Sequence, residues 1–345
     1  MTTPRELGFV MPPEWAPHER CWMAWPCRAE LWGERMAAAR QTYAEVAKTI
    51  AQFEPVTMIA RPDLTAEASL QCGQGISVLP LDHDDSWTRD TAPTFVRGPE
   101  GALAGIDWRF NGYGERAPKF DQDAQLARAI CERLKIRRFE APIVLEGGAV
   151  HVDGEGTALL CAESVLDPKR NPEMTRAQVE EILADHLGVA GTIWLERGLV
   201  DDETGGHVDN LACFVRPGVV VALVSEDPDD PDHDALRDNL ERLQGAKDAQ
   251  GRALEVIEIA RPAPRLREDG RRLTASYINF YAANGAVLMP MFDDPMDDAA
   301  YKTIAAAFPD RRVIQIDASD LVLGGGGIHC ITQQQPAAPD QSDSR

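Results

Sequence analysis

Hydrophobic and polar positions alternate in four stretches of the chain, and a tight turn that contains glycine interrupts each stretch. β-Branched and aromatic residues flank these turns, a pattern typical of two strands joined as a hairpin. The pattern therefore predicts four hairpins. They are Thr94–Trp108, Gly148–Leu166, Asn210–Asp227 and Ser276–Phe292.

A helical pattern follows each predicted hairpin, and a short apolar strand follows each helix. In the first helix Ala124, Ala127 and Ile130 recur three residues apart, which places them on one face. Each helix begins near Asp, Thr or Pro, as helix starts commonly do. The predicted helices are Asp121–Leu134, Thr175–Leu187, Asp232–Leu243 and Asp297–Phe308, and the predicted strands are Ile136–Phe139, Thr192–Leu195, Leu254–Ile259 and Val313–Ile316.

The N-terminal region predicts a further version of this unit. The order strand–strand–helix–strand thus occurs about five times, and such units can stack around an axis as radial repeats do. We predict an α/β protein with one domain over residues 1–336 and a disordered tail over residues 337–345. The N-terminal elements are a strand at Cys21–Pro26, a long helix at Leu31–Phe53, and strands at Val56–Ala60 and Ile76–Leu79.

Composition narrows the classes of function. The 345 residues are 44% apolar and 26% charged, which is ordinary for a globular protein. No apolar run approaches the ~18 residues that span a bilayer, and the first residues lack the cationic start of a secretory signal. The 35 Lys and Arg stand against 56 Asp and Glu, a net charge of −21. Because nucleic-acid binding needs clustered Lys and Arg, we do not expect nucleic acid as a partner. The lack of a long apolar run likewise leads us to expect no membrane partner.

The seven cysteines are scattered, odd in number, and contain no pair of CxxC units. This disfavours a disulfide framework and a structural zinc site, and it fits a reducing cytoplasm. Most of the cysteines lie in apolar stretches, where a small buried residue is the ordinary interpretation. Cys330 differs because it comes after four glycines, whose backbone can approach a ligand closely.

The distinctive polar residues lie in the connections between successive units. The connections are DHDDSWTRD at 82–90, LEGG at 145–148, DDETGGHVD at 201–209 and GGGGIHC at 324–330. If the units repeat about an axis, equivalent connections converge at one end of it. The arrangement therefore predicts a single site that contains Asp90, Glu146, His207, Asp209 and Cys330.

A cysteine with a distant histidine is the arrangement of a nucleophile, in which the thiolate attacks and the histidine handles protons. Cys330 and His207 are the candidates for these roles. Glu146 lies between an apolar pair and two glycines, and a carboxylate is costly to bury alone. His329 is a weaker candidate for the base, because adjacent residues on a strand face opposite sides.

A metal site is the alternative interpretation of the same residues. His207 and Asp209 would face one side of a strand, and Asp82–Asp85 with Glu203 could complete a ligand set. However, no HExxH motif occurs, and a reactive cysteine beside a hard metal would be unusual. We therefore expect no metal and no organic cofactor.

The charge of the site indicates the substrate. Three carboxylates around one thiol would repel an anion and raise the pKa of the thiol. A guanidinium is a planar permanent cation whose five N–H donors suit two carboxylates, and its central carbon is open to a thiolate. We predict a small cationic guanidine as substrate, with Trp87 beside Asp90 lining the pocket. Substitution of Asp230, in the acidic run DPDDPDHD, should be nearly silent.

Seven motifs that cover nearly all of Met11–Pro336 occur in one order. They are MPPEWAPHERCWMAWP, DDSWTRDTAPTFV, DWRFNGYGE, LEGGAVHVDGEGTALL, GGHVDNLACFVRPGVV, ASYINFYAANGAVLMP and GGGGIHCITQQQP. In this order they resemble the agmatine deiminases of the guanidine-modifying superfamily. The resemblance implies the pentein fold, a five-bladed pseudo-symmetric α/β propeller of ββαβ units. It also implies hydrolysis of agmatine to N-carbamoylputrescine and ammonia without a cofactor.

The same resemblance implies a role for each site residue. Cys330 is the nucleophile that forms an amidino-thioether, and His207 is the proton carrier. Asp90 and Asp209 are the carboxylates that hold the guanidinium, and Glu146 supports His207 or the guanidinium. A homodimer is implied as well. From the charges we further expect Cys330 to be a neutral thiol until substrate binds, when its proton passes to His207.

Three other functions remain open from the sequence. A deiminase of arginine or peptidyl-arginine would use the same chemistry, but the α-carboxylate of arginine would need an additional Arg or Lys in the pocket. An amidinotransferase would pass the amidino group to an amine instead of water. A binding protein of the same fold would not need Cys330 and His207.

Overall fold

The computed structural model describes residues 2–338 of the chain, and within them the strands form five sheets. Four sheets are three-stranded units in which a helix connects an antiparallel hairpin to a parallel third strand. The first unit contains β4 Thr94–Arg97, β5 Leu103–Arg109, α6 Asp123–Leu134 and β6 Arg137–Val144, and the second contains β7 Val150–Val152, β8 Thr157–Cys161, α8 Arg176–Leu187 and β9 Gly191–Leu195. The third unit contains β10 Ala212–Arg216, β11 Val219–Val224, α9 His233–Gly245 and β12 Glu255–Ala260. The fourth unit contains β13 Tyr281–Ala283, β14 Ala286–Met291, α10 Asp297–Ala307 and β15 Arg312–Asp317.

The remaining sheet joins the two ends of the described chain. Its order is β16-β1-β2-β3, and β16 runs antiparallel to β1 with Cys21 opposite Gln334. The strand β16 therefore takes the place that the first hairpin strand has in the other units. The elements are β1 His18–Ala24, α2 Met36–Ile50, β2 Val56–Ala60, α3 Thr65–Cys72, β3 Ile76–Pro80 and β16 Gln333–Pro336.

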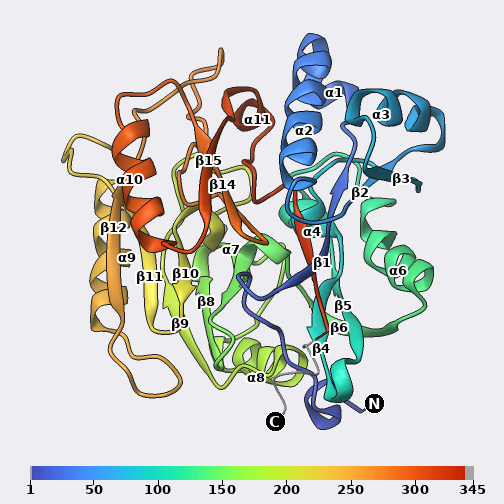
Figure 1. Cartoon of the computed structure of the whole chain (residues 1–345). Coiled ribbons are helices and arrows are strands. Elements are labelled where there is room, and N and C mark those ends of the chain that lie inside the picture. The colour runs from blue at the N-terminus through green and yellow to red at the C-terminus, as the bar shows by residue number, and fades with distance from the viewer. Residues whose placement is uncertain (1, 339–345) are drawn as a thin grey trace.

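The longer helices lie toward the periphery of the molecule and the strands toward its middle (Figure 1). Each helix turns one apolar face inward, as the periodicity predicts. In α9, for example, Ala235, Leu236 and Leu243 are buried, although most residues of this helix are polar. Among residues 2–338, no helix is both long and apolar enough to cross a bilayer.

The four hairpins and their helices are confirmed, but the second hairpin ends at Cys161, because Ala162–Val165 is the short helix α7. The N-terminal unit also needs correction. The predicted helix Leu31–Phe53 is two helices, α1 Ala29–Trp32 and α2, separated by the 3-10 turn Gly33–Arg35. Gly33 has φ 47°, a left-handed backbone that ends α1. The helix α3 between β2 and β3 was not predicted.

Two further differences from the predicted elements lie in the C-terminal half of the chain. The fourth hairpin begins only at Tyr281, because Ser276–Phe280 is irregular backbone. The strand β16, with the sequence QQQP, has no β-forming pattern of its own and exists because it pairs with β1. Ala337 and Ala338 belong to no helix or strand, and the rest of the predicted tail, 339–345, lies outside the described residues.

Candidate active site

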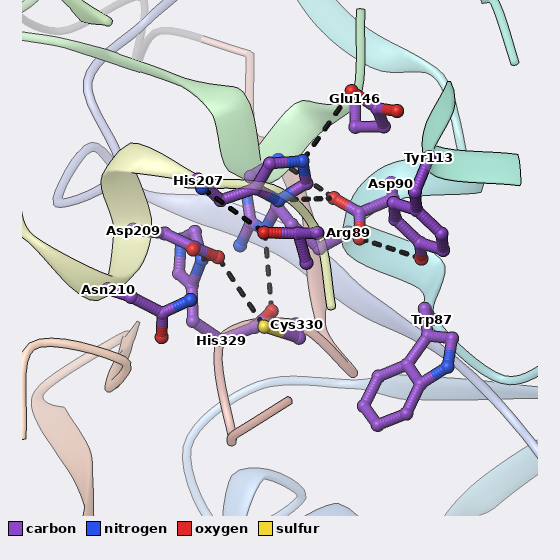
Figure 2. A network of polar contacts seen from close by, with 12 residues as sticks. Trp87, Arg89, Asp90, Tyr113, Glu146, His207, Asp209, Asn210, His329 and Cys330 are labelled. Carbon is purple, nitrogen blue, oxygen red and sulfur yellow. Dashed lines mark hydrogen bonds and ion pairs between the residues drawn. The ribbon is translucent and has the colours of Figure 1, made fainter. Parts of the chain in front are cut away.

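The polar connections between units meet at one place, as predicted (Figure 2). The backbone N–H of Gly148 donates to Oδ1 of Asp90 at 2.9 Å, and His207 Nδ1 lies 3.7 Å from the same oxygen. The sulfur of Cys330 lies 3.5 Å from Oδ2 of Asp209. Each of these segments stands just before the first strand of a sheet, which explains why they converge from distant parts of the chain.

His207 is wholly buried between two carboxylates. Its Nδ1 faces Asp90, and its Nε2 lies 3.5 Å from Oε2 of Glu146. Burial alone would lower the pKa of the imidazole, but the charges of Asp90 and Glu146 outweigh it and raise the pKa to about 9. His207 is therefore an imidazolium at neutral pH. Within the described chain neither ring nitrogen has a hydrogen-bond partner, although each faces a carboxylate.

Asp90 lies on the short helix α4 Thr88–Thr91. Its Oδ2 accepts a hydrogen bond from the hydroxyl of Tyr113 at 3.0 Å, a contact that the sequence did not predict. Burial raises the pKa of Asp90 to about 6, with His207 opposing the shift and Asp209 and Glu146 adding to it. A bound cation would remove the remaining proton, because it stabilises the carboxylate.

Glu146 is held by a buried arginine that sequence analysis missed. Nε of Arg170 donates to both carboxylate oxygens, at 2.9 and 3.1 Å. Burial opposes ionisation, but Arg170 and then His207 lower the pKa of Glu146 to about 2. Glu146 is thus a permanent anion that faces His207 on one side and Arg170 on the other.

Cys330 is buried, and its thiol lies beside two polar side chains of the site. Nδ2 of Asn279 lies 3.2 Å from the sulfur, and Oδ2 of Asp209 lies at 3.5 Å. Burial, then Asp209 and Asp90, raises the pKa of Cys330 well above its usual value. This shift favours the neutral thiol in the free protein, the state that the sequence predicts.

Asn279 was missed, although a signal for it existed. It belongs to the connection Ser276–Phe280, which precedes β13 as the other site segments precede their strands. The four connections identified from the sequence left this one out, and a search of it for polar residues would have found Asn279. Its Oδ1 also accepts the backbone N–H of His329 at 3.0 Å, so it links the nucleophile to the loop that carries it.

Only one carboxylate oxygen of Asp209 accepts a hydrogen bond within the described chain. Oδ2 accepts from Nδ1 of His329 at 2.9 Å and lies near Cys330, whereas the buried Oδ1 has no hydrogen-bond partner. Burial disfavours its charge, but His329 and then His207 keep the pKa of Asp209 below its usual value. A buried anionic oxygen without a partner is costly and marks a place for a donor.

Two glycines leave the space in which these groups meet. A Cβ on Gly148 would lie 2.7 Å from His207 Nδ1, 2.8 Å from Asp209 Oδ2 and 3.0 Å from Asp90 Oδ1. A Cβ on Gly326 would lie 3.1 Å from the sulfur of Cys330. The LEGG and GGGG sequences therefore serve close packing of functional groups.

A cavity of about 500 Å³ reaches Cys330, Asp90 and Trp87, so the structure places Trp87 in the wall as predicted. Six carboxylate residues and three arginines line this cavity. Each of the arginines has a carboxylate of the chain as its own partner. Arg28 pairs with Asp85 at 3.2 Å, Arg116 with Asp167 at 3.0 Å and Arg271 with Asp269 at 2.8 Å.

One expectation about an acidic residue needs correction. Arg89, which precedes Asp90 in the sequence, places its NH1 3.1 Å from Glu14. Asp230 was expected to tolerate substitution, yet it is buried and accepts from NH1 of Arg261 at 3.0 Å and of Arg272 at 2.7 Å. Removing one partner of such a buried network is costly, so Asp230 is structurally important.

The alternative metal site does not assemble. Among residues 2–338 no three His, Cys, Asp or Glu side chains come together in a way that could hold a metal ion. His83, from the proposed ligand set, instead places Nε2 2.9 Å from the carbonyl oxygen of Trp25.

A buried thiol, a charged imidazole and open carboxylates beneath an acidic cavity define a cysteine-dependent enzyme that acts on a cationic group. The family model for Porphyromonas-type peptidyl-arginine deiminase matches residues 10–336, and the chain belongs to this family. The agmatine deiminase of Stutzerimonas stutzeri is 43% identical over 97% of this chain and 98% of its own length. The agmatine deiminase of Pseudomonas aeruginosa is 42% identical, with the same coverage.

Solved structures agree with this family. The structure of the agmatine deiminase of Enterococcus faecalis aligns with a TM-score of 0.95 and 35% identity, covering 98% of each chain. A dimethylarginine dimethylaminohydrolase aligns over 92% of this chain with a TM-score of 0.54 and 15% identity, which is a likeness of fold alone. The mixed α/β fold with small sheets is therefore that of the guanidine-modifying enzymes.

Proposed function

We propose that the chain hydrolyses agmatine to N-carbamoylputrescine and ammonia through a covalent amidino-cysteine intermediate. The observation that supports this most is the position of the Cys330 thiol at the end of an acidic cavity, beside Asp90 and Asp209. Asp209 Oδ1 has no partner in the described chain, and both oxygens of Asp90 retain a free lone pair. A guanidinium supplies the donors that these oxygens lack.

We propose the following first half-reaction. The bound guanidinium adds a positive charge next to Cys330 and favours its thiolate, whose proton leaves to solvent. The sulfur attacks the central guanidinium carbon and forms a C–S bond. His207 then donates a proton to one amino group, the C–N bond breaks, and ammonia departs. The product is a cationic amidino-thioether on Cys330 and a neutral His207.

Water completes the reaction in the second half. Neutral His207 takes a proton from a water molecule that attacks the amidino carbon. The C–S bond then breaks, the sulfur leaves as a thiolate, and the added oxygen becomes the carbonyl of the ureido product after loss of its proton. Of the two protons released to solvent, one protonates ammonia and the other restores the neutral thiol of Cys330. This sequence differs from our expectation in one step, because His207 with a pKa of about 9 already holds a proton and cannot take that of the thiol.

The lining of the cavity favours agmatine over arginine. Agmatine carries a second positive charge where arginine carries an α-carboxylate. The three lining arginines, Arg28, Arg116 and Arg271, are each occupied by a carboxylate of the chain, and acidic groups outnumber them. An α-carboxylate would have to displace one of these ion pairs, whereas an ammonium meets an excess of negative charge.

We also propose that the five sheets are the blades of a closed α/β propeller. The connection pattern repeats in four sheets, and β16 completes the first sheet from the far end of the chain. The site segments each precede the first strand of a sheet, which is the arrangement expected around a central axis. A homodimer, from the family resemblance, and a cytoplasmic location, from the unpaired pattern of cysteines, stay predictions.

The test is a comparison of substrates. Purified protein is incubated with agmatine, arginine and a peptidyl-arginine, and the ureido product and ammonia are measured. We expect equal amounts of both products from agmatine and a much lower kcat/KM for the other two. A higher kcat/KM for arginine or the peptide would contradict the assignment. Amidino transfer to an added amine, without ammonia released to water, would indicate an amidinotransferase.

A further inference from the structure

A second histidine, adjacent to the nucleophile in the sequence, is also clamped between two carboxylates. Nδ1 of His329 lies 2.9 Å from Oδ2 of Asp209, and its Nε2 lies 2.9 and 3.0 Å from the two oxygens of Glu14. All three side chains are buried. Ionised carboxylates only accept hydrogen bonds, so both ring nitrogens must donate. The geometry thus requires His329 to be an imidazolium.

This arrangement repeats the order of charges around His207. One series runs from Asp90 through His207 and Glu146 to Arg170. The other runs from Asp209 through His329 and Glu14 to Arg89, whose NH1 lies 3.1 Å from Glu14. In each series an aspartate at the cavity end is followed by a histidine, a glutamate and a buried arginine. The proposed function uses the first series for proton transfer and leaves the second without a role.

We propose that His329 is a positioning residue that keeps Asp209 charged and oriented and so makes the Cys330 thiol easier to ionise. This inference rests on the proposed function for its consequence in turnover. By holding Oδ2 of Asp209, His329 leaves Oδ1 free for a guanidinium N–H. The oxygen that receives the His329 proton is also the one 3.5 Å from the Cys330 sulfur. Its negative charge, which opposes the thiolate, is therefore partly balanced by the imidazolium.

The surroundings of both groups are accounted for. The thiol faces the charges of Asp209 and Asp90 and the neutral amide of Asn279. His329 faces Asp209 and Glu14, with Arg89 and His151 behind Glu14. The pKa of His329 is raised, because Glu14 and Asp209 outweigh burial and the charge of Arg89.

His151 provides a matched control. Its Nε2 lies 3.6 Å from Glu14, but it does not contact Asp209. Its Nδ1 accepts the backbone N–H of Phe214 at 3.4 Å. Replacing this histidine therefore removes a buried ring beside Glu14 without removing the charge that faces Asp209.

The experiment compares His329→Gln with His151→Gln and the wild-type protein. The rate of alkylation of Cys330 by iodoacetamide is followed from pH 6 to 10 by mass spectrometry of the peptide that contains it, without agmatine. In His329→Gln we expect the apparent pKa of the thiol to rise by about one unit or more, with alkylation near neutral pH about tenfold slower. His151→Gln should leave the profile unshifted. In agmatine turnover, His329→Gln should lower kcat more than it raises KM.

The outcomes separate this proposal from a structural role. An unshifted Cys330 profile in folded His329→Gln, or an equal shift in His151→Gln, would overturn it. If His329→Gln does not fold, ¹⁵N-histidine NMR of the wild-type protein decides, with the His329 resonances assigned by elimination through single variants of the other six histidines. Two protonated ring nitrogens at His329 at pH 8 support the proposal, and a neutral ring there refutes it. Because alkylation needs no substrate, a shifted profile without agmatine turnover would refute the proposed function alone.

Discussion

Gly148→Ala tests whether three functional groups truly meet around one backbone position. The new Cβ would lie 2.7 Å from His207 Nδ1, 2.8 Å from Asp209 Oδ2 and 3.0 Å from Asp90 Oδ1. To reach an ordinary contact of 3.4 Å, these atoms must retreat by about 0.7, 0.6 and 0.4 Å. The N–H of residue 148 also donates to Asp90, so the backbone cannot move away without losing that bond.

The expected loss is larger in catalysis than in stability. Misplacement of catalytic groups by a distance of this order costs about 10²-fold in rate, and we expect kcat/KM for agmatine to fall by about that factor. Overpacking of a buried position lowers the free energy of unfolding by about 1–3 kcal/mol. Steady-state ammonia release gives the first quantity, and urea denaturation followed by circular dichroism gives the second.

Gly191→Ala is the control for the added methyl group. Gly191 begins the strand β9, and a Cβ there would lie 3.6 Å from Cα and Cβ of Ala249, an ordinary contact. This variant should keep the kcat/KM of the wild-type protein. If Gly148→Ala folds and turns over agmatine as fast as Gly191→Ala, the three polar groups do not act together and the site is wrongly assembled.

Four further predictions address the groups of the site. Cys330→Ser should fold but lose nearly all turnover, since a serine hydroxyl without activation is a far weaker nucleophile; wild-type protein quenched with agmatine should show an added amidino mass on the peptide of Cys330. Asp90→Asn should lower kcat/KM by an amount equivalent to about 2–5 kcal/mol of lost transition-state stabilisation. Asp310→Asn, at an exposed position, should have the kcat/KM of the wild-type protein. Equal losses in the two variants would show that the effect is not specific to the site. In saturating agmatine, kcat should fall at alkaline pH as His207 loses its proton, because the neighbouring carboxylates outweigh burial and raise the pKa of His207 to about 9. Glu146→Gln removes one of these carboxylates and should move the alkaline fall of kcat to lower pH by about one unit. An unchanged alkaline fall would exclude His207 as the acid. Prolonged treatment with a chelator should leave turnover unchanged, and a loss restored by a divalent ion would contradict the thiol mechanism.

The regular units and the main site residues could be predicted because both depend on short stretches of sequence. Strand alternation and helix periodicity are local patterns, and they repeat along the chain. The repetition in turn indicated that equivalent connections converge. This is why Asp90, Glu146, His207, Asp209 and Cys330 could be assigned to one place before any contact was known. The agreement of several motifs with one family narrowed the chemistry further.

Pairing between distant segments decided the rest. The strand β16 has a polar sequence that gives no local sign of a strand, and only its register with β1 makes it one. Asn279 contacts Cys330 and Arg170 contacts Glu146 across many residues of sequence. Asn279 lies within one of the seven motifs, but the motif does not indicate that its side chain meets Cys330. Local pattern contains no information about such partners, because they are selected by packing.

Protonation states likewise belong to the tertiary structure. From the sequence His207 was an ordinary imidazole able to accept the thiol proton, and His329 was a residue facing away. Each histidine instead lies between two buried carboxylates and is itself buried. The low dielectric strengthens those interactions, so both rings hold a second proton. The amino-acid sequence determined which chemical groups are present and roughly where they gather, while the three-dimensional packing determined their charges and hence the direction in which protons move.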